Sequence, residues 1–307
     1  RKVYGDDIPS TIKMLGYECY SRSNFKKFSL PNIITSLYEG CFYYCESLSV
    51  ITLPSNLREI GNKCFGNCFA LKVLDLPITV TTIGCCFVDN CYSLTSISVP
   101  ETLTLLPQYC FHGCSKLSGF SFPDHLKSIG DFCFQDCSSL KSIVIPDCEC
   151  FIGEKVFDHC IKLTSCNIDG KINSIYDLCF NCCSCLVSVD IPNTVTNIGK
   201  SCFRECHMLK NITLPHQLQA IPHQCFFNCF ELEKFVIPKN VSALGSCAFS
   251  RCIKIQTIVI PSRVKSIGHN CFNGCQSLEI TIPSTVTFTD KYCFKKCKKI
   301  TKENENK

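Results

Sequence analysis

The chain has 307 residues, a net charge of +5 and 30 cysteines, almost one residue in ten. The small and dispersed positive charge argues against general nucleic-acid binding, and no apolar run is long enough to span a membrane. The sequence therefore predicts neither a nucleic-acid partner nor a membrane span.

The chain begins with a degenerate repeat. Ile8-Pro9, Leu15-Gly16 and Cys19-Tyr20 have the residue types of the later units, but their spacing is off by one residue. The outermost turn of a solenoid faces water on one side, and such turns have atypical sequences. Residues 1–29 are therefore predicted to form an N-terminal capping repeat.

From residue 30 onward the sequence repeats every 23 residues. One unit reads Cys45-x-x-Leu48-x-x-Ile51-x-Leu53-Pro54-x-x-Leu57-x-x-Ile60-Gly61-x-x-Cys64-Phe65-x-x-Cys68. A fixed period in the twenties is typical of a solenoid, in which each repeat packs on its neighbours. We expect about twelve turns over residues 30–297, the last one degenerate, followed by a polar tail at 298–307.

Each unit contains one predicted strand. Ile51-Thr52-Leu53 alternates apolar and polar residues, which predicts a short strand with Ile51 and Leu53 facing inward. Pro54 ends the strand, because proline has no N–H to donate to the ladder. After the corner at Gly61 the spacing indicates tight 3-10 or irregular turns. The predicted fold class is a β-rich repeat solenoid.

Two cysteine columns and one phenylalanine column are expected to fill the interior. The second cysteine of each unit keeps the 23-residue interval without a slip from Cys45 to Cys275. The first column, which includes Cys86, accepts Val156 and Ala248 and so requires only a small apolar side chain. The phenylalanine column, which includes Phe87, predicts a buried spine. Most of the cysteines are therefore predicted to be packing residues.

This unit resembles the BspA-like leucine-rich repeats, a 23-residue class found in bacterial and protozoan surface proteins. The resemblance extends from Ile8 to Cys297, although the residue before phenylalanine is usually alanine in that family and is mostly cysteine here. It implies a right-handed leucine-rich-repeat coil with a parallel sheet on its concave side. It also implies adhesion to host matrix proteins such as fibronectin and fibrinogen, or binding to other cells.

No residues converge in a pattern that predicts catalysis, a cofactor or a metal. The seven histidines lie at variable turn positions, and no phosphate-binding glycine loop is present. The segment Cys179-x-x-Cys182-Cys183-x-Cys185 has a metal-ligand spacing, but it lacks a second matching pair. We therefore expect a protein that is not an enzyme and has no catalytic, cofactor-binding or metal residues.

The predicted partner-binding surface is the outward face of the concave sheet. Solenoids commonly bind protein partners over such broad faces, and an ordinary solvated sheet is the alternative interpretation. A protein partner, for example an extracellular-matrix or host-cell protein, would contact the outward residue of each strand: Thr52, Asp75, Ser98, Ser121, Val144, Asn167, Asp190, Thr213, Val236 and Val259.

The sequence leaves the location of the protein open. The resemblance favours the cell surface, whereas the lack of a signal-peptide pattern and the many predicted reduced thiols favour the cytoplasm. The predicted function is a non-enzymatic protein-interaction and adhesion module. The alternatives are an intracellular scaffold or regulator that docks a cytosolic enzyme, and a thiol-based redox or metal-binding protein.

Overall fold

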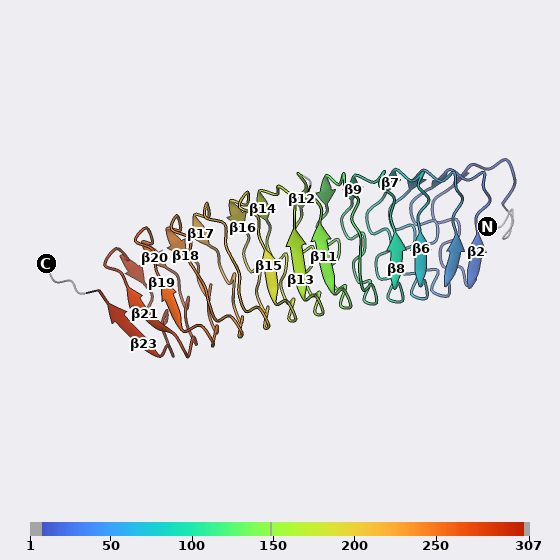
Figure 1. The fold of residues 1–307 in the computed structure, drawn as a ribbon. Coiled ribbons are helices and arrows are strands. Elements are labelled where there is room, and N and C mark those ends of the chain that lie inside the picture. The colour runs from blue at the N-terminus through green and yellow to red at the C-terminus, as the bar shows by residue number, and fades with distance from the viewer. Residues whose placement is uncertain (1–7, 148, 304–307) are drawn as a thin grey trace. The chain divides into compact units, whose positions relative to one another are not determined.

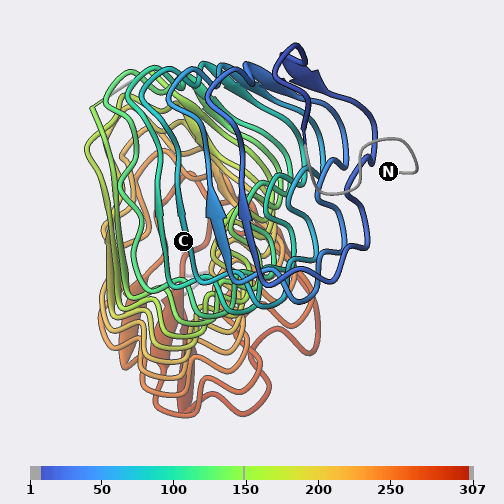
Figure 2. The same ribbon diagram turned by 90° about the vertical axis from the view of Figure 1, so that its right-hand side faces the viewer.

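The computed structural model describes residues 8–147 and 149–303 and divides the chain into two units, residues 1–160 and 161–307. Each unit is a stretch of parallel β-solenoid, as the 23-residue period predicts, and the described residues contain no helix. In the view of Figure 2, each turn within a unit runs once around the coil before the next turn begins beside it.

The first row of strands lies where the sequence predicts it, just before the repeated proline. Its strands pair in parallel with partners about one repeat away, for example Ile51 of β4 opposite Phe28 of β2. In Figure 1 this row runs along the lower part of each unit. In unit 1 it comprises β2 (Lys27–Ser29), β4 (Val50–Thr52), β6 (Val73–Asp75), β8 (Ser96–Ser98) and β11 (Ser142–Ile145). In unit 2 it comprises β13 (Ser165–Ile168), β15 (Ser188–Asp190), β19 (Thr257–Val259), β21 (Glu279–Ile282) and β23 (Lys299–Lys302).

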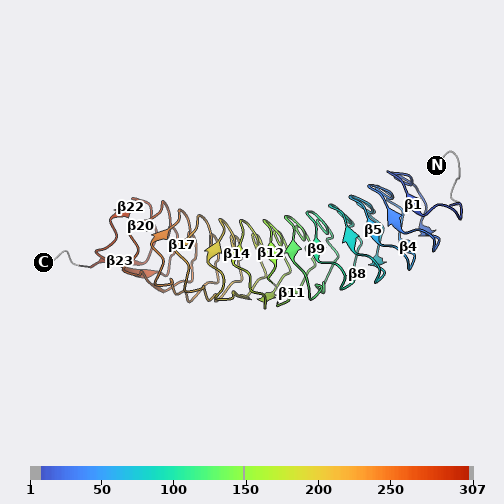
Figure 3. The ribbon, with the colours of Figure 1, turned by 90° about the horizontal axis from the view of Figure 1, so that it is seen from above.

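A second row of strands, absent from the sequence prediction, lies just before the repeated glycine. Each of its strands has only two residues, and the second is buried in most of them, such as Ile60 of β5. Figure 3 shows the row on a different side of the coil from β4 and β8. In unit 1 it comprises β1 (Met14–Leu15), β3 (Ser36–Leu37), β5 (Glu59–Ile60), β7 (Thr82–Ile83), β9 (Leu105–Leu106), β10 (Ser128–Ile129) and β12 (Phe151–Ile152). In unit 2 it comprises β14 (Ser174–Ile175), β16 (Asn197–Ile198), β17 (Ala220–Ile221), β18 (Ala243–Leu244), β20 (Ser266–Ile267) and β22 (Phe288–Thr289).

The phenylalanine spine forms within each unit as predicted. In unit 2, the rings of Phe180, Phe203 and Phe226 are fully buried or nearly so. They stack almost parallel, with centroids 5.5 and 5.6 Å apart and interplanar angles of 3°. Burial of one such ring contributes about 1.5–3 kcal/mol relative to its exposure. The spine is therefore a main source of hydrophobic stabilisation in each turn.

The register of one turn differs from the prediction. Val88, not Phe87, has the hydrogen bonds of the spine position, since its carbonyl accepts from the Cys114 thiol as the Phe111 carbonyl accepts from Cys137. Phe87 therefore occupies the first cysteine position, and its ring meets Phe65 edge to face at 78°. Cys86 is half-exposed and does not belong to the buried column. The residue types of Cys86-Phe87 imitate the motif, but the constant position of Cys91 decides the register.

The second cysteine column has a hydrogen-bonding role that explains its constancy. Each thiol donates to a carbonyl in the preceding turn: Cys68 to Phe42 and Cys91 to Phe65 in unit 1, and Cys229 to Phe203 in unit 2, with Sγ to O distances of 3.1–3.2 Å. Burial raises the pKa of the Cys91 thiol well above its ordinary value, which keeps it protonated and able to donate. A thiol here both fills space and satisfies a buried carbonyl.

The stretch predicted to be a polar tail contributes a strand. Residues Lys299–Lys302 form β23, which pairs in parallel with β21 over four residues and extends the first row of unit 2. All four of its side chains are exposed, so backbone pairing and not core packing places it there. The remainder of the predicted tail beyond residue 303 lies outside the described residues.

Candidate functional site

The ten residues predicted to bind a partner all have exposed side chains on the side of the first strand row. In unit 1 they lie on β4, β6, β8 and β11, except for Ser121, which lies in a stretch without a strand. In unit 2 Asn167, Asp190 and Val259 lie on β13, β15 and β19, whereas Thr213 and Val236 lie between strands. All ten residues therefore face outward, and their role in binding a partner stays a prediction.

The first row is interrupted in unit 1 at the turn that carries Phe120. At the inward position β6 and β8 carry Leu74 and Ile97, but the next turn carries Phe120 and forms no strand. The Phe120 ring packs on Phe111 and Phe134 of the spine, with both centroid distances 4.9 Å. A ring at the inward position does not by itself prevent pairing, since Phe28 of β2 holds the same position opposite Ile51 of β4.

This interruption creates a shallow depression, which we call the Phe120 hollow. Its volume is about 530 Å³, which lies within the range of about 300–1,000 Å³ that is usual for small-molecule sites. Ser96, Gly119, Ser121, Ser142 and Val144 line it, and Asp124 stands at its edge. Ile97, Phe120, Phe122 and Pro146 line it as well, so the lining is mixed, with hydroxyl groups beside apolar side chains.

A second hollow, the Phe235 hollow, lies in unit 2, also at a turn of the first row whose inward residue is phenylalanine. Phe235 holds the inward position, and its ring packs on Phe226 and Phe249 at centroid distances of 5.0 and 4.8 Å. Only an isolated bridge from Lys234 to Asn211 remains of the strand pairing. The hollow has a volume of about 630 Å³ and is lined by Val236, Val259, Pro261 and their neighbours.

The Phe235 hollow has an apolar centre and a charged margin. The Val236 and Val259 side chains are 80% and 81% exposed, an unusual state for two apolar neighbours in one depression. Lys234, Lys239 and Glu233 also line it. A site of this kind buries an apolar side chain of a partner and fixes its orientation with charges at the margin. The sequence prediction named Val236 and Val259 but not the hollow that unites them.

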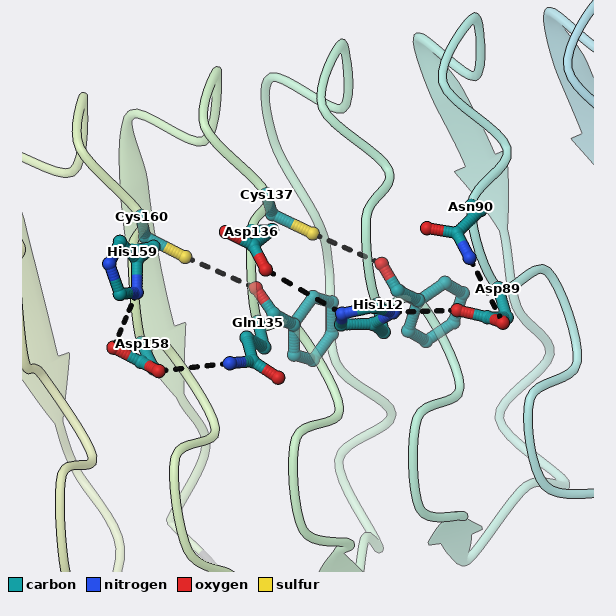
Figure 4. Close-up of polar contacts among 11 residues, drawn as sticks. Asp89, Asn90, His112, Gln135, Asp136, Cys137, Asp158, His159 and Cys160 are labelled. Carbon is teal, nitrogen blue, oxygen red and sulfur yellow. Dashed lines mark hydrogen bonds and ion pairs between the residues drawn. The ribbon is translucent and has the colours of Figure 1, made fainter. Parts of the chain in front are cut away.

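The turn side of unit 1 carries a ladder of carboxylates, histidines and amides (Figure 4). His112 Nδ1 lies 2.6 Å from Asp89 Oδ1, and His112 Nε2 lies 3.6 Å from Asp136 Oδ2. One turn further, Asp158 pairs with His159 at 2.8 Å and accepts a hydrogen bond from Gln135 at 3.0 Å. These groups resemble an acid–base pair, but the nearby thiols of Cys137 and Cys160 are buried and donate to carbonyls. The ladder therefore acts as a set of turn-to-turn ties.

The His112 tie predicts a pH-dependent stability. The hydrogen bond with Asp89 raises the pKa of His112 above its ordinary value, against the opposing effect of burial. Because the folded pKa exceeds the unfolded value of about 6.5, the stabilisation is complete below that pH and is lost as the pH rises through the folded pKa. We expect His112→Gln to lower the free energy of unfolding by about 1 kcal/mol more in mild acid than in mild alkali.

Urea unfolding of the wild type and of His112→Gln on both sides of neutrality measures this difference. An NMR titration gives the pKa of His112 directly, and Asp89→Asn should lower it. His125→Gln, which changes an exposed histidine, is the matched control and should show no such pH dependence. An equal cost of His112→Gln at both pH values would contradict the tie.

The cysteines around Cys182, whose spacing brought a metal site into consideration, differ in their exposure. Cys179 and Cys183 are buried, Cys182 is half-buried and Cys185 is exposed, so the four are not presented to one point on the surface. Among residues 8–147 and 149–303, no three His, Cys, Asp or Glu side chains gather in a way that could hold a metal ion. Cys148 lies outside the described residues. In unit 1, Cys19 Sγ lies 3.3 Å from Cys41 Sγ, and this contact lowers the pKa of Cys19.

Comparison with known proteins agrees with the solenoid. The chain resembles a leucine-rich cell surface protein from Faecalibacterium prausnitzii A2-165, with 20% identity, a TM-score of 0.56, and 96% of this chain and 84% of the other covered. A leucine-rich repeat protein from Bacteroides ovatus gives 21% identity and a TM-score of 0.56, with coverages of 95% and 88%. The pneumococcal vaccine antigen PcpA gives 16% identity and a TM-score of 0.56, with 91% of this chain and 79% of the other covered. These likenesses show the fold.

No curated protein sequence matches the chain. In the described residues, no helix has the length and apolar character needed to cross a bilayer. The family model for the BspA type leucine rich repeat region matches residues 6–95, 81–187, 105–229 and 173–301, which together span nearly the whole sequence. Leucine-rich repeats of this kind are in general non-enzymatic folds that bind protein partners. The chain belongs to the BspA-type leucine-rich repeat family.

Proposed function

We propose that this protein is a non-enzymatic adhesion module that binds a protein partner through its first strand row. The observation that carries the proposal is the Phe235 hollow, in which Val236 and Val259 are 80% and 81% exposed in a depression of about 630 Å³. Desolvated apolar anchors in concave sites supply most of the energy of a protein interface. The polar strand residues around them would then form the rim.

The strand-free stretch at Phe235 supports this role in a second way. Residues 235–237 take part in no strand pairing, and Val236 is exposed between the buried Phe235 and Ile237. An extended partner segment that places an apolar side chain against Val236 would gain selectivity from its alternate side chains. Lys234 and Lys239 beside the hollow favour a segment with acidic residues next to its apolar anchor.

The partner we propose is an extracellular-matrix or host-cell protein. Two relatives of the same fold support this choice, because one is described as a leucine-rich cell surface protein and another as a pneumococcal vaccine antigen. Family membership supports it as well. On this proposal the protein acts at the cell surface and has no catalytic role.

The test measures binding of the full chain to immobilised fibronectin and fibrinogen by surface plasmon resonance. We expect Val236→Arg/Val259→Arg to weaken the binding at least tenfold, because two exposed apolar residues that the partner would cover become charges. The control, Ile78→Arg/Ile161→Arg, adds the same charge at exposed apolar residues outside the first row, since Ile78 is 83% and Ile161 42% exposed. It should bind like the wild type.

Two outcomes would contradict the proposal. Absence of wild-type binding to either protein would remove the matrix-protein assignment. Equal weakening by the control would show that added charge, not the Phe235 hollow, determines the affinity. Thr52→Arg/Asp75→Arg/Ser98→Arg tests the corresponding face of unit 1, and a larger loss there would move the site to that unit.

A further inference from the structure

A basic hollow lies on the turn side of unit 2, apart from the strand row. It has a volume of about 370 Å³, and Arg251, Lys295 and Lys296 contribute three positive charges to its lining. Phe230, Asn273 and Gln276 also line it, and no described aspartate or glutamate does. A concave surface that holds three like charges raises the local concentration of anions.

The three cations lack acidic partners among the described residues. Other cations of unit 2 are paired, for example Lys254 with Glu231 and Lys298 with Glu279, both at 2.7 Å. None of the ion pairs in the described part of the chain includes Arg251, Lys295 or Lys296. Because the neighbouring carboxylates already pair with other side chains, no carboxylate of the described residues neutralises the charge of the basic hollow.

The backbone beside the hollow adds N–H donors, whose partial positive charges have the same sign as the three side chains. On this side of unit 2, N–H groups donate to carbonyls of the following turn, as Phe249 does to Cys271, Phe272 to Cys293 and Gly274 to Lys295. The stacked peptide dipoles therefore all direct their positive ends toward the last turn. There the equivalent N–H groups of Phe294 and Lys296 have no acceptor among the described residues.

The third N–H group of this last turn shows which kind of group can accept a hydrogen bond at this end of the unit. Tyr292 N donates to the Asp290 carboxylate at 2.9 Å, so an anion already caps one of the three peptide stacks. Lys296 has a φ of 66°, and left-handed residues in such turns form backbone concavities that bind anions. Two of the three unpaired cations, Lys295 and Lys296, thus lie on the same turn as the uncapped N–H groups.

We infer that the basic hollow binds a sulfated saccharide. A sulfate group would lie among Arg251, Lys295 and Lys296, with the open N–H groups of the last turn close by. The Phe230 ring, which stacks on His207 at 4.7 Å, offers an aromatic face to a sugar ring. Asn273 donates through Nδ2 to Asn270, which leaves its Oδ1 available to accept from a hydroxyl. Neither the ring nor the amide is needed for a bare anion.

The test is calorimetric titration of the full chain with a heparin-derived hexasaccharide at physiological salt. We expect binding that weakens as salt is added and falls at least tenfold in Arg251→Ala/Lys296→Ala. Lys254→Ala/Lys298→Ala removes the same charge from paired lysines and should bind like the wild type. Circular dichroism of both variants should be unchanged, because all four side chains are exposed.

Several outcomes would overturn the inference. These are the absence of binding, equal loss in both double variants, or equal affinity for the desulfated hexasaccharide. Equal affinity for polyphosphate or single-stranded DNA would replace the saccharide by a general polyanion. Since the residues changed here are not those of the Phe235 hollow, failure of this test leaves the proposed protein partner untouched.

Discussion

Replacing Phe203 by alanine is expected to lower the free energy of unfolding by about 3–5 kcal/mol. The ring is fully buried and stacks on Phe180 and Phe226 at 5.5 and 5.6 Å. Alanine leaves a cavity and removes two aromatic contacts, each of which adds about 0.5–1.5 kcal/mol beyond burial. Because turns of a solenoid contact only their neighbours, little of the cavity can be closed from elsewhere.

Urea unfolding followed by circular dichroism measures the effect. Phe288→Ala is the control, since that ring belongs to unit 2 but is 60% exposed, and its cost should be within about 0.5 kcal/mol. A cost of Phe203→Ala no larger than that of the control would contradict a spine that carries the stability of the unit. We expect the slope of free energy against urea to stay unchanged if the unit still unfolds cooperatively.

The sequence predicts the solenoid because its strongest signals are periodic and local. The interval from Cys45 to Cys68 recurs, the proline after each strand recurs, and both follow from the stacking of equal turns. The second strand row was missed because pairs such as Glu59–Ile60 are too short to show an alternation. Stacking on neighbouring turns makes them strands, and that information is not local.

The register of Cys86-Phe87 was misjudged for a related reason. The two residues reproduce the motif one position early, and only the distance to Cys91 distinguishes the alternatives. The structure resolves them by placing Val88 where its carbonyl receives the Cys114 thiol. A constant hydrogen-bonding cysteine is thus a better marker of register in this chain than a large apolar residue.

The outward face could be predicted, but its shape could not. Alternation within the strands gives the exposure of Thr52 and Val259 directly. The Phe235 hollow depends on how the Phe235 ring packs against Phe226 and Phe249. These contacts join different turns, so no local pattern in the sequence reveals them. The basic hollow likewise joins Arg251 with Lys295, two repeats away, and no local pattern relates them.

The corner glycines provide the second large effect that we expect. A Cβ at Gly61 would lie 2.6 Å from the backbone nitrogen of Glu39 and 2.7 Å from the carbonyl carbon of Tyr38, well inside contact distance. The corner column shows the same restriction in the sequence, since each tyrosine or proline in it stands between two glycines. The column reads Gly16, Tyr38, Gly61, Gly84, Pro107, Gly130, Gly153, Tyr176, Gly199, Pro222, Gly245, Gly268 and Asp290.

Gly61→Ala is therefore expected to cost about 1–3 kcal/mol of unfolding free energy in unit 1 through steric overlap alone. It would place a residue with a Cβ at the corner next to Tyr38. Nowhere in the column do two neighbouring corners both lack glycine. Gly119→Ala is the matched control, because a Cβ at Gly119 meets no atom within 4 Å. Neither glycine has a positive φ, so backbone strain does not separate the two. If both substitutions shifted the urea midpoint equally, the loss of glycine flexibility in the unfolded chain and not the close approach of turns would govern the column.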